Sequence, residues 1–244
     1  MPSNKIQNKI TSPRMFEAVD TVYPADCVEF CSEQQSTYLA VGTYKLQEHD
    51  SEFEQKPTRV GQVRLYEVAD GTLYKFFSHL RIIKEVISGS GVLDMKWNNS
   101  LLATAHSDGD VSVYKLMDKL LSFEDSIECD SSDTLLLSLD FVGDRICTSA
   151  SNGKLFILSV CESGARKVMD IRAHEMEAWI TKFDIHDENI LYSGSDDCKL
   201  KVWDTRSACV ASKVLTRYHR QLNFQGILWV FVVYSAILAM KILY

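Results

Sequence analysis

Three residues with the chemistry of a hydrolase occur within a short stretch of the chain: His174, Ser193 and Asp197. A serine hydroxyl beside a histidine that a carboxylate orients is the arrangement that activates a nucleophile for acyl transfer. The same residues also suit a buried polar relay, in which Asp197 holds His174, His174 holds the Ser193 hydroxyl, and that hydroxyl meets the indole N–H of Trp203. We favour the relay, because the repeat described below places Ser193 inside a strand.

Other patterns of enzyme chemistry are weak in this sequence. The serine-hydrolase pattern G-x-S-x-G is absent, since Gly89-Ser90-Gly91 has the wrong spacing. The cysteines form no C-x-x-C pair and no two histidines have ligand spacing on one element, so we expect no metal and no cofactor. The net charge of −7 argues against nucleic acid as a partner. Scattered cysteines without a secretory signal favour a cytoplasmic protein.

The candidate residues lie in a segment, 172–206, that alternates strand-like runs with turns. The runs are 179–183, 190–193 and 199–203, and residues typical of turns separate them. A histidine followed about 30 residues later by Trp-Asp marks the WD repeat, in which each repeat forms one blade of a propeller. The segment therefore predicts one four-stranded blade that positions the relay.

The same pattern recurs earlier in the chain at a period of about 45 residues. The strand that opens each unit ends in V-E-F, M-K-W, L-D-F or T-K-F, and the third strand ends in an anchoring residue. The opening strands end at Phe30, Trp97, Phe141 and Phe183, and the anchors that mark the blade ends are Tyr66, Tyr114, Leu158 and Trp203. We therefore predict an all-β WD-repeat propeller over residues 16–220, with four recognisable blades. The acidic run 118–133 is interpreted as a solvated loop between blades, with a docking patch for a basic partner as the alternative.

The two ends of the chain lack the repeat. Residues 1–15 are polar and are interpreted as a disordered leader, with a transit peptide as the alternative. Residues 221–244 form an apolar tail outside the propeller, of which 221–240 carry no charge. That stretch is long enough for a membrane anchor, is rich enough in β-branched residues for a buried strand, or is the end of an alternative transcript. We favour the last interpretation.

Several segments together resemble one family. They are A-V-D-T-V-Y-P-A-D-C-V-E-F-C (18–31), G-V-L-D-M-K-W (91–97), A-H-E-M-E-A-W-I (173–180), Y-S-G-S-D-D (192–197) and W-D-T-R (203–206). The chain resembles the WD-repeat diphthine methyl ester hydrolases of diphthamide biosynthesis. The resemblance implies a propeller of seven blades, so that this chain would be a C-terminally truncated form. It also implies removal of a methyl ester from over-methylated diphthine on a histidine of elongation factor 2, before amidation to diphthamide. Other proteins of that pathway would be further partners, and a membrane would be one only through residues 221–240.

Ester hydrolysis of this kind needs a base that activates water, and the relay leaves two carboxylates unused. Glu177 lies in the segment that enters the fourth blade, beside Trp179, whose ring could pack on the trimethylammonium group that the resemblance implies. Asp94, in the opening strand of the second blade, is the other candidate, and Asp196 is a weaker one. The alternative for Glu177 and Asp94 is that each is an ordinary polar residue at the surface or caps a loop. A non-catalytic scaffold and an inactive truncated form are the competing functions, because a propeller does not by itself imply an enzyme.

Overall fold

The computed structural model describes residues 18–33, 36–47, 58–70, 78–87, 89–206 and 211–216. The predicted leader, residues 1–15, and the apolar tail, residues 221–244, lie outside these ranges. The described part contains no helix long and apolar enough to cross a membrane.

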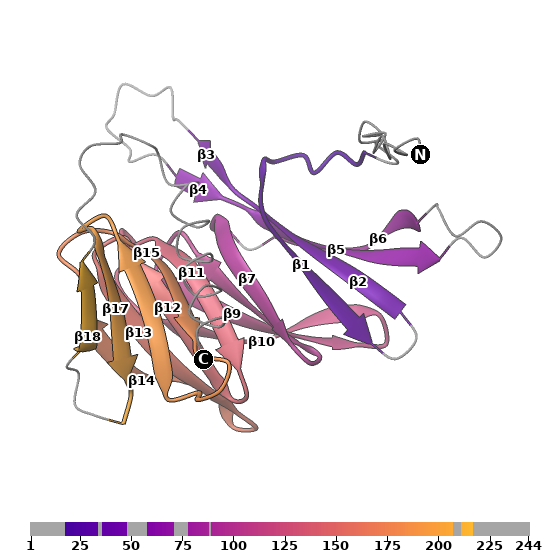
Figure 1. The fold of residues 1–244 in the computed structure, drawn as a ribbon. Helices are drawn as coiled ribbons and strands as arrows, with labels where there is room; N and C mark the ends of the chain where they lie inside the picture. The colour runs from indigo at the N-terminus through magenta and orange to yellow at the C-terminus, as the bar shows by residue number, and fades with distance from the viewer. Residues whose placement is uncertain are drawn as a thin grey trace, which may run out of the picture.

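Four antiparallel sheets of four strands each follow one another along the chain (Figure 1). Blade 1 contains β1 (Ala25–Glu33), β2 (Ser36–Thr43), β5 (Gln62–Asp70) and β6 (Ser78–Ile87). Blade 2 contains β7 (Val92–Asn98), β8 (Leu101–His106), β9 (Asp110–Met117) and β10 (Leu120–Glu128). Blade 3 contains β11 (Leu136–Val142), β12 (Arg145–Ala150), β13 (Lys154–Cys161) and β14 (Gly164–Arg172). Blade 4 contains β15 (Ala178–Phe183), β16 (Ile190–Ser195), β17 (Lys199–Asp204) and β18 (Ala211–Thr216).

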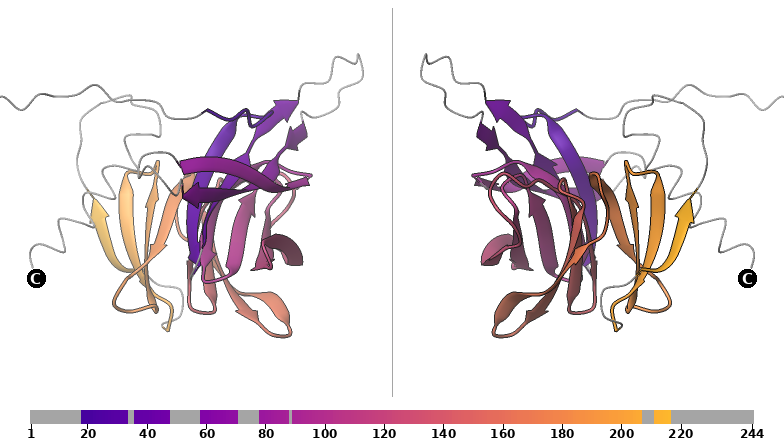
Figure 2. Two further views of the ribbon diagram at one scale, coloured as in Figure 1. Left: turned by 90° about the vertical axis from the view of Figure 1, so that its right-hand side faces the viewer. Right: turned by 90° about the vertical axis from the view of Figure 1, so that its left-hand side faces the viewer.

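This arrangement confirms the predicted all-β propeller architecture. The four predicted opening strands are β1, β7, β11 and β15, and they lie next to one another in that order. The four anchors lie in the third strands of their blades, and the sheet of each blade continues into a fourth strand. A two-stranded hairpin of β3 (Lys45–Gln47) and β4 (Thr58–Val60) stands between β2 and β5. Blade 4 and blade 1 lie on opposite sides of the view in Figure 1, and Figure 2 shows the strands of blade 4 side by side at one side of the molecule.

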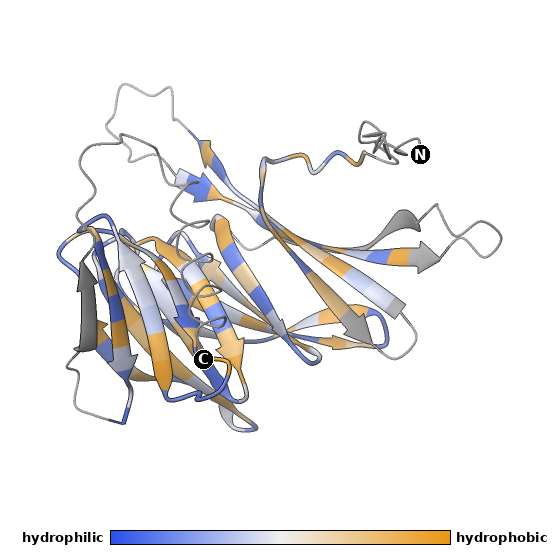
Figure 3. Cartoon of the chain, viewed as in Figure 1, coloured by the Kyte–Doolittle hydropathy of each residue, from blue (hydrophilic) through white to orange (hydrophobic). Residues whose placement is uncertain are grey.

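The core forms where the faces of successive blades meet. The second and third strands of blades 1 to 3 turn short apolar side chains toward the next blade, such as Val63, Val111 and Leu155, and each is fully buried. Burying one such side chain stabilises the folded state by about 1.5–3 kcal/mol relative to leaving it exposed. Figure 3 shows apolar residues within the strands and hydrophilic residues at many of the turns between them. Neighbouring blades are therefore held together by apolar contacts between their faces. Alternate residues of each strand point to the same face, so a period-two pattern places apolar residues there.

The turn before the third strand of blades 2, 3 and 4 needs an unusual backbone. Gly109 and Gly153 have φ angles of +86° and +78° there, and Cys198 has +61° at the matching position of blade 4. A Cβ on Gly153 would also lie 2.4 Å from the carbonyl oxygen of His174. Glycine is therefore needed at that turn both for its conformation and for the close approach of the neighbouring loop.

The prediction of a loop over residues 118–133 is wrong for residues 120–128, which form β10, whereas residues 129–133 lie outside the strands. Leu121 and Ile127 of β10 are buried, while Glu124 and Glu128 are exposed. An outer strand needs only one apolar face, so its other face can carry the charges that suggested a loop.

Candidate functional site

The relay of blade 4 is present in the structure. The carboxylate of Asp197 lies 2.9 Å from His174 Nδ1, and His174 Nε2 lies 2.8 Å from the Ser193 hydroxyl. The indole N–H of Trp203 donates to the same hydroxyl at 2.9 Å. Because a carboxylate only accepts, His174 carries its proton on Nδ1, and Ser193 donates to Nε2.

The surroundings of this relay fit a structural role. Ser193 is 1% exposed, and it lies on the face of β16 that packs toward blade 3. Burial lowers the pKa of His174, against the opposing attraction of Asp197, so the imidazole is neutral. Burial tends to raise the pKa of Asp197, but the hydrogen bond and charge of His174 and two backbone N–H groups bring it below its ordinary value. The relay therefore gives its buried polar groups hydrogen-bond partners. Ser193 is not accessible to act as a nucleophile.

Blade 2 contains a second relay that sequence reasoning missed. His106 Nε2 lies 2.8 Å from the Thr104 hydroxyl, and His106 Nδ1 lies 3.1 Å from the Ser90 hydroxyl. Thr104 donates to the carbonyl oxygen of Ser112, so it accepts from Nε2–H and leaves Nδ1 to accept from Ser90. Burial lowers the pKa of His106 to about 4. Thr104 occupies the register position of Ser193, which was the signal available in the sequence.

Glu177 and Trp179 lie together where β15 begins. The carbonyl oxygen of Glu177 accepts a hydrogen bond of 3.2 Å from the backbone N–H of Asp196, which ties this segment to the β16–β17 turn. The Glu177 side chain is half-buried, and Trp179 is 41% exposed. Glu177, Trp179 and Asp196, the three candidates in blade 4, therefore lie at the same rim of that blade.

Asp94 lies elsewhere, between blades 2 and 3. Its Oδ1 accepts from the backbone N–H of Met95 at 2.9 Å, and its Oδ2 accepts from the backbone N–H of Leu139 at 2.7 Å. Burial raises the pKa of Asp94 to about 6, against the lowering effect of those hydrogen bonds, the Lys182 charge and the Ser138 hydroxyl. A carboxyl group with a pKa near neutrality is a stronger base than an ordinary one and still ionises at pH 7.

A row of alternating charges continues from Asp94 across the opening strands. Glu29, Lys96, Asp140 and Lys182 occupy the same register position in β1, β7, β11 and β15, and we call them the first-strand ladder. Lys96 pairs with Glu29, and Lys182 Nζ lies 2.7 Å from Asp140 Oδ1. The other oxygen of Asp140 accepts from the backbone N–H of Phe183 at 2.9 Å.

The ladder brings opposite charges into partial contact with water. The side chains of Glu29, Lys96 and Lys182 remain partly exposed, and burial together with the charge of Lys182 lowers the pKa of Lys96. With Asp94, the ladder holds three carboxylates and two ammonium groups. The sequence signal was the charged middle residue of V-E-F, M-K-W, L-D-F and T-K-F, whose aromatic ends alone were used to align the repeats.

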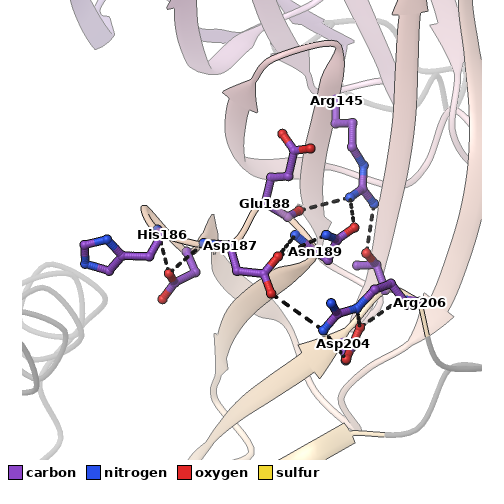
Figure 4. Close-up of polar contacts among 9 residues, drawn as sticks. Arg145, His186, Asp187, Glu188, Asn189, Asp204 and Arg206 are labelled. Atoms are coloured by element: carbon purple, nitrogen blue, oxygen red, sulfur yellow. Dashed lines mark hydrogen bonds and ion pairs between the residues drawn. The ribbon is translucent and has the colours of Figure 1, made fainter.

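A further polar cluster joins the lower ends of blades 3 and 4 (Figure 4). The guanidinium of Arg145 donates to the carbonyl oxygen of Glu188 at 3.0 Å and to the Thr205 hydroxyl at 3.0 Å. Asp204 pairs with Arg206 through two contacts of 2.8 Å, and these hydrogen bonds lower the pKa of Asp204 to about 2. In the described ranges, no group of three or more His, Cys, Asp or Glu residues could hold a metal ion. The cluster therefore has a structural role, which is to connect blade 3 to blade 4.

Comparisons with known proteins agree with the fold and the resemblance. No family model matches the chain. A diphthine methyltransferase homolog of Dictyostelium discoideum is 34% identical over 202 residues, covering 75% of this chain and 54% of that protein. The human diphthine methyltransferase is 32% identical over 224 residues, covering 78% of this chain and 48% of its own length.

The solved structures show the fold at lower identity. A chain in the crystal structure of a mitotic checkpoint complex superposes with a TM-score of 0.54 and 14% identity, covering 86% of this chain and 62% of that one. This chain thus spans about half the length of the curated relatives that it matches. Over that length it is a homologue of the proteins named diphthine methyltransferase, as the segments quoted from its sequence predicted.

Proposed function

We propose that this chain hydrolyses the methyl ester of methylated diphthine on elongation factor 2, which yields diphthine for amidation to diphthamide. The observation that carries the proposal is the 34% identity over 202 residues to a protein named as a diphthine methyltransferase homolog. The substrate is a protein side chain, so elongation factor 2 is the proposed partner, together with other proteins of the pathway.

The chemistry requires a base, a water molecule and a positive group beside the ester. Asp94 would take a proton from water, and the water oxygen would attack the ester carbonyl carbon. Lys182, whose charge reaches Asp94, would stabilise the negative oxygen that forms. The bond to the methoxy oxygen would then break, and the proton held by Asp94 would leave with methanol. Glu177 beside Trp179 is the competing base at the rim of blade 4.

The name diphthine methyltransferase, which the relatives carry, suggests methyl transfer, whereas the proposal is hydrolysis, and one assay separates the two reactions. Purified chain is incubated with methylated elongation factor 2 in ¹⁸O-labelled water, and the modified histidine peptide is weighed by mass spectrometry. Hydrolysis releases methanol and places ¹⁸O in the new carboxylate. A methyl transfer to another acceptor leaves no label there, and consumption of a methyl donor would overturn the hydrolase proposal.

Variants assign the base. We expect Asp94→Asn to lose most of the hydrolysis rate, and Glu177→Gln to keep it. Lys199→Met, which removes a cation that pairs with the exposed Glu175, is the matched control and should leave the rate unchanged. Loss of activity in Glu177→Gln alone would move the base to the rim of blade 4.

A test in cells addresses the alternatives. The 244-residue chain and the human relative are each expressed in cells that lack the diphthine methyl esterase, and the mass of the histidine peptide is measured. Restored diphthamide with both supports the enzyme. If the relative alone restores it while the chain is present and still binds elongation factor 2, a scaffold is favoured instead. We place the reaction in the cytoplasm, and fractionation of the same cells tests whether residues 221–240 anchor the protein to a membrane.

A further inference from the structure

Two large apolar side chains of blade 1 are far more exposed than the residues that match them in the other blades, of which only Trp97 is not buried. Val28 is 58% exposed and Phe30 is 62% exposed, and both lie on one face of β1. The strand register matches Phe30 to Phe141 and Phe183, which are 5% and 3% exposed. The register likewise matches Val28 to Met95 and Leu139, which are fully buried. In blades 2 to 4 this face packs on the preceding blade, so blade 1 presents the same face without a cover.

Blade 4 also has an incompletely covered face, which is the one that the following blade covers in blades 1 to 3. Leu200 and Val202 of β17 are only half-buried. The matching residues of blade 2, Val111 and Val113, and of blade 3, Leu155 and Ile157, are buried because the following blade covers them. The described array therefore ends in one face that lacks a preceding blade and one face that lacks a following blade.

The charges of the first-strand ladder match across these two ends. The ladder reads acid, base, acid, base from Glu29 to Lys182, and neighbours of opposite sign form ion pairs at the first and third junctions. The open end at blade 4 presents Lys182, and the open end at blade 1 presents Glu29. A junction from blade 4 to another blade 1 would therefore continue the alternation with a pair of opposite charges.

We propose that a second copy of this chain covers both open faces. Blade 4 of each copy packs on blade 1 of the other, which closes a ring of eight blades through two equal junctions. Charge complementarity supports this occupant, because Lys182 at the open face of one copy would meet Glu29 at the open face of the other. The proposal concerns assembly and does not depend on the proposed enzyme activity.

The mass of the purified chain in solution tests the proposal. Light scattering over a range of concentrations should give twice the chain mass of 27.7 kDa. A species that stays monomeric throughout would overturn the proposal and leave the faces to another segment or partner. Assemblies that grow without limit as concentration rises would also overturn it, because the junction would then not close.

Two surface variants test which faces meet. Phe30→Asp and Val202→Asp should each be monomeric at concentrations where the unmodified chain is dimeric, with unchanged circular dichroism. Phe123→Asp is the control, because Phe123 is also 60% exposed but lies on the outer strand β10, and its dimer should persist.

Mixing the two monomeric variants gives the sharpest result. A Phe30→Asp chain keeps an intact blade 4, and a Val202→Asp chain keeps an intact blade 1, so one junction can still form between them. The mixture should therefore contain a heterodimer that neither variant forms alone. If the unmodified chain is dimeric but the mixture stays monomeric, the junction does not join blade 4 to blade 1 and the proposed ring is wrong.

Discussion

The Oδ2 atom of Asp94 accepts a hydrogen bond of 2.7 Å from the backbone N–H of Leu139. Asp94 belongs to β7 and Leu139 to β11, two opening strands that lie in different sheets. Asp140 repeats the contact one blade further on, with the backbone N–H of Phe183. Carboxylates of the opening strands therefore connect blades 2, 3 and 4 where no backbone ladder does, and this makes stability depend on pH.

Asp94→Asn should change how stability varies with pH. The pKa of Asp94 is raised from 3.8 to about 6 in the folded state, so the folded state binds this proton more tightly than the unfolded state. The contribution of Asp94 is thus most favourable below about pH 4 and declines as pH rises to 6, by about 1–3 kcal/mol. Asparagine retains an acceptor and cannot ionise.

Urea unfolding of both proteins between pH 4 and 7 measures this effect. The Asp94→Asn protein should gain stability relative to the unmodified protein as pH rises through that range. Profiles that stay parallel would show that the Asp94 carboxyl is not shifted by its surroundings.

Ser193→Ala should lower the stability of the fold, because Ser193 has a structural role in the relay. The change leaves the indole N–H of Trp203 and Nε2 of His174 without their shared partner in a buried place. Each unsatisfied buried group costs about 1–3 kcal/mol, so the melting temperature should fall by several degrees. Ser163→Ala, in an exposed turn, is the control and should melt like the unmodified protein. A Ser193→Ala protein that loses ester hydrolysis while melting normally would restore the nucleophile interpretation.

Gly153→Ala should cost more stability than Gly89→Ala, although both glycines have a φ of +78°. Alanine pays about 1–2 kcal/mol for that backbone conformation at either position. At Gly153 the new Cβ would also collide with the carbonyl oxygens of His174 and Met176, whereas nothing lies within 4 Å at Gly89. The difference in the free energy of unfolding, measured in urea, isolates the close approach of the loop. Equal losses would mean that the loop moves away freely.

The cysteines should differ sharply in reactivity. Cys161 is exposed, and hydrogen bonds from Ser163 lower the pKa of its thiol, whereas burial raises that of Cys147. Because the thiolate is the reactive form, brief alkylation of the native protein near pH 8 should label Cys161 and spare Cys147. Mass spectrometry of the digested protein reads both sites. Labelling of Cys147 only after unfolding completes the expectation, and early labelling there would show that blades 3 and 4 separate readily.

The positional repeat made much of this molecule predictable. The alternating apolar residues of each strand, the turn glycines and the His174–Ser193–Asp197–Trp203 set are local patterns, so their spacing alone indicated blades and a relay. The same locality explains the mistake at β10, because an outer strand with one polar face has the composition of a loop. It also explains why the relay through His106 was missed, since its histidine comes from the strand itself and not from the loop before the blade.

Contacts between blades depend on residues about one repeat apart. Three features depend on how the blade faces stack. The middle residues of the opening strands form a ladder of alternating charge, and Asp94 accepts a hydrogen bond from Leu139. Phe30 is exposed, whereas Phe141 is buried. A single repeat holds no information about what lies against its faces. The sequence by itself determined the strands and the relay within a blade, whereas only the tertiary structure decided which charges meet and which apolar faces stay open.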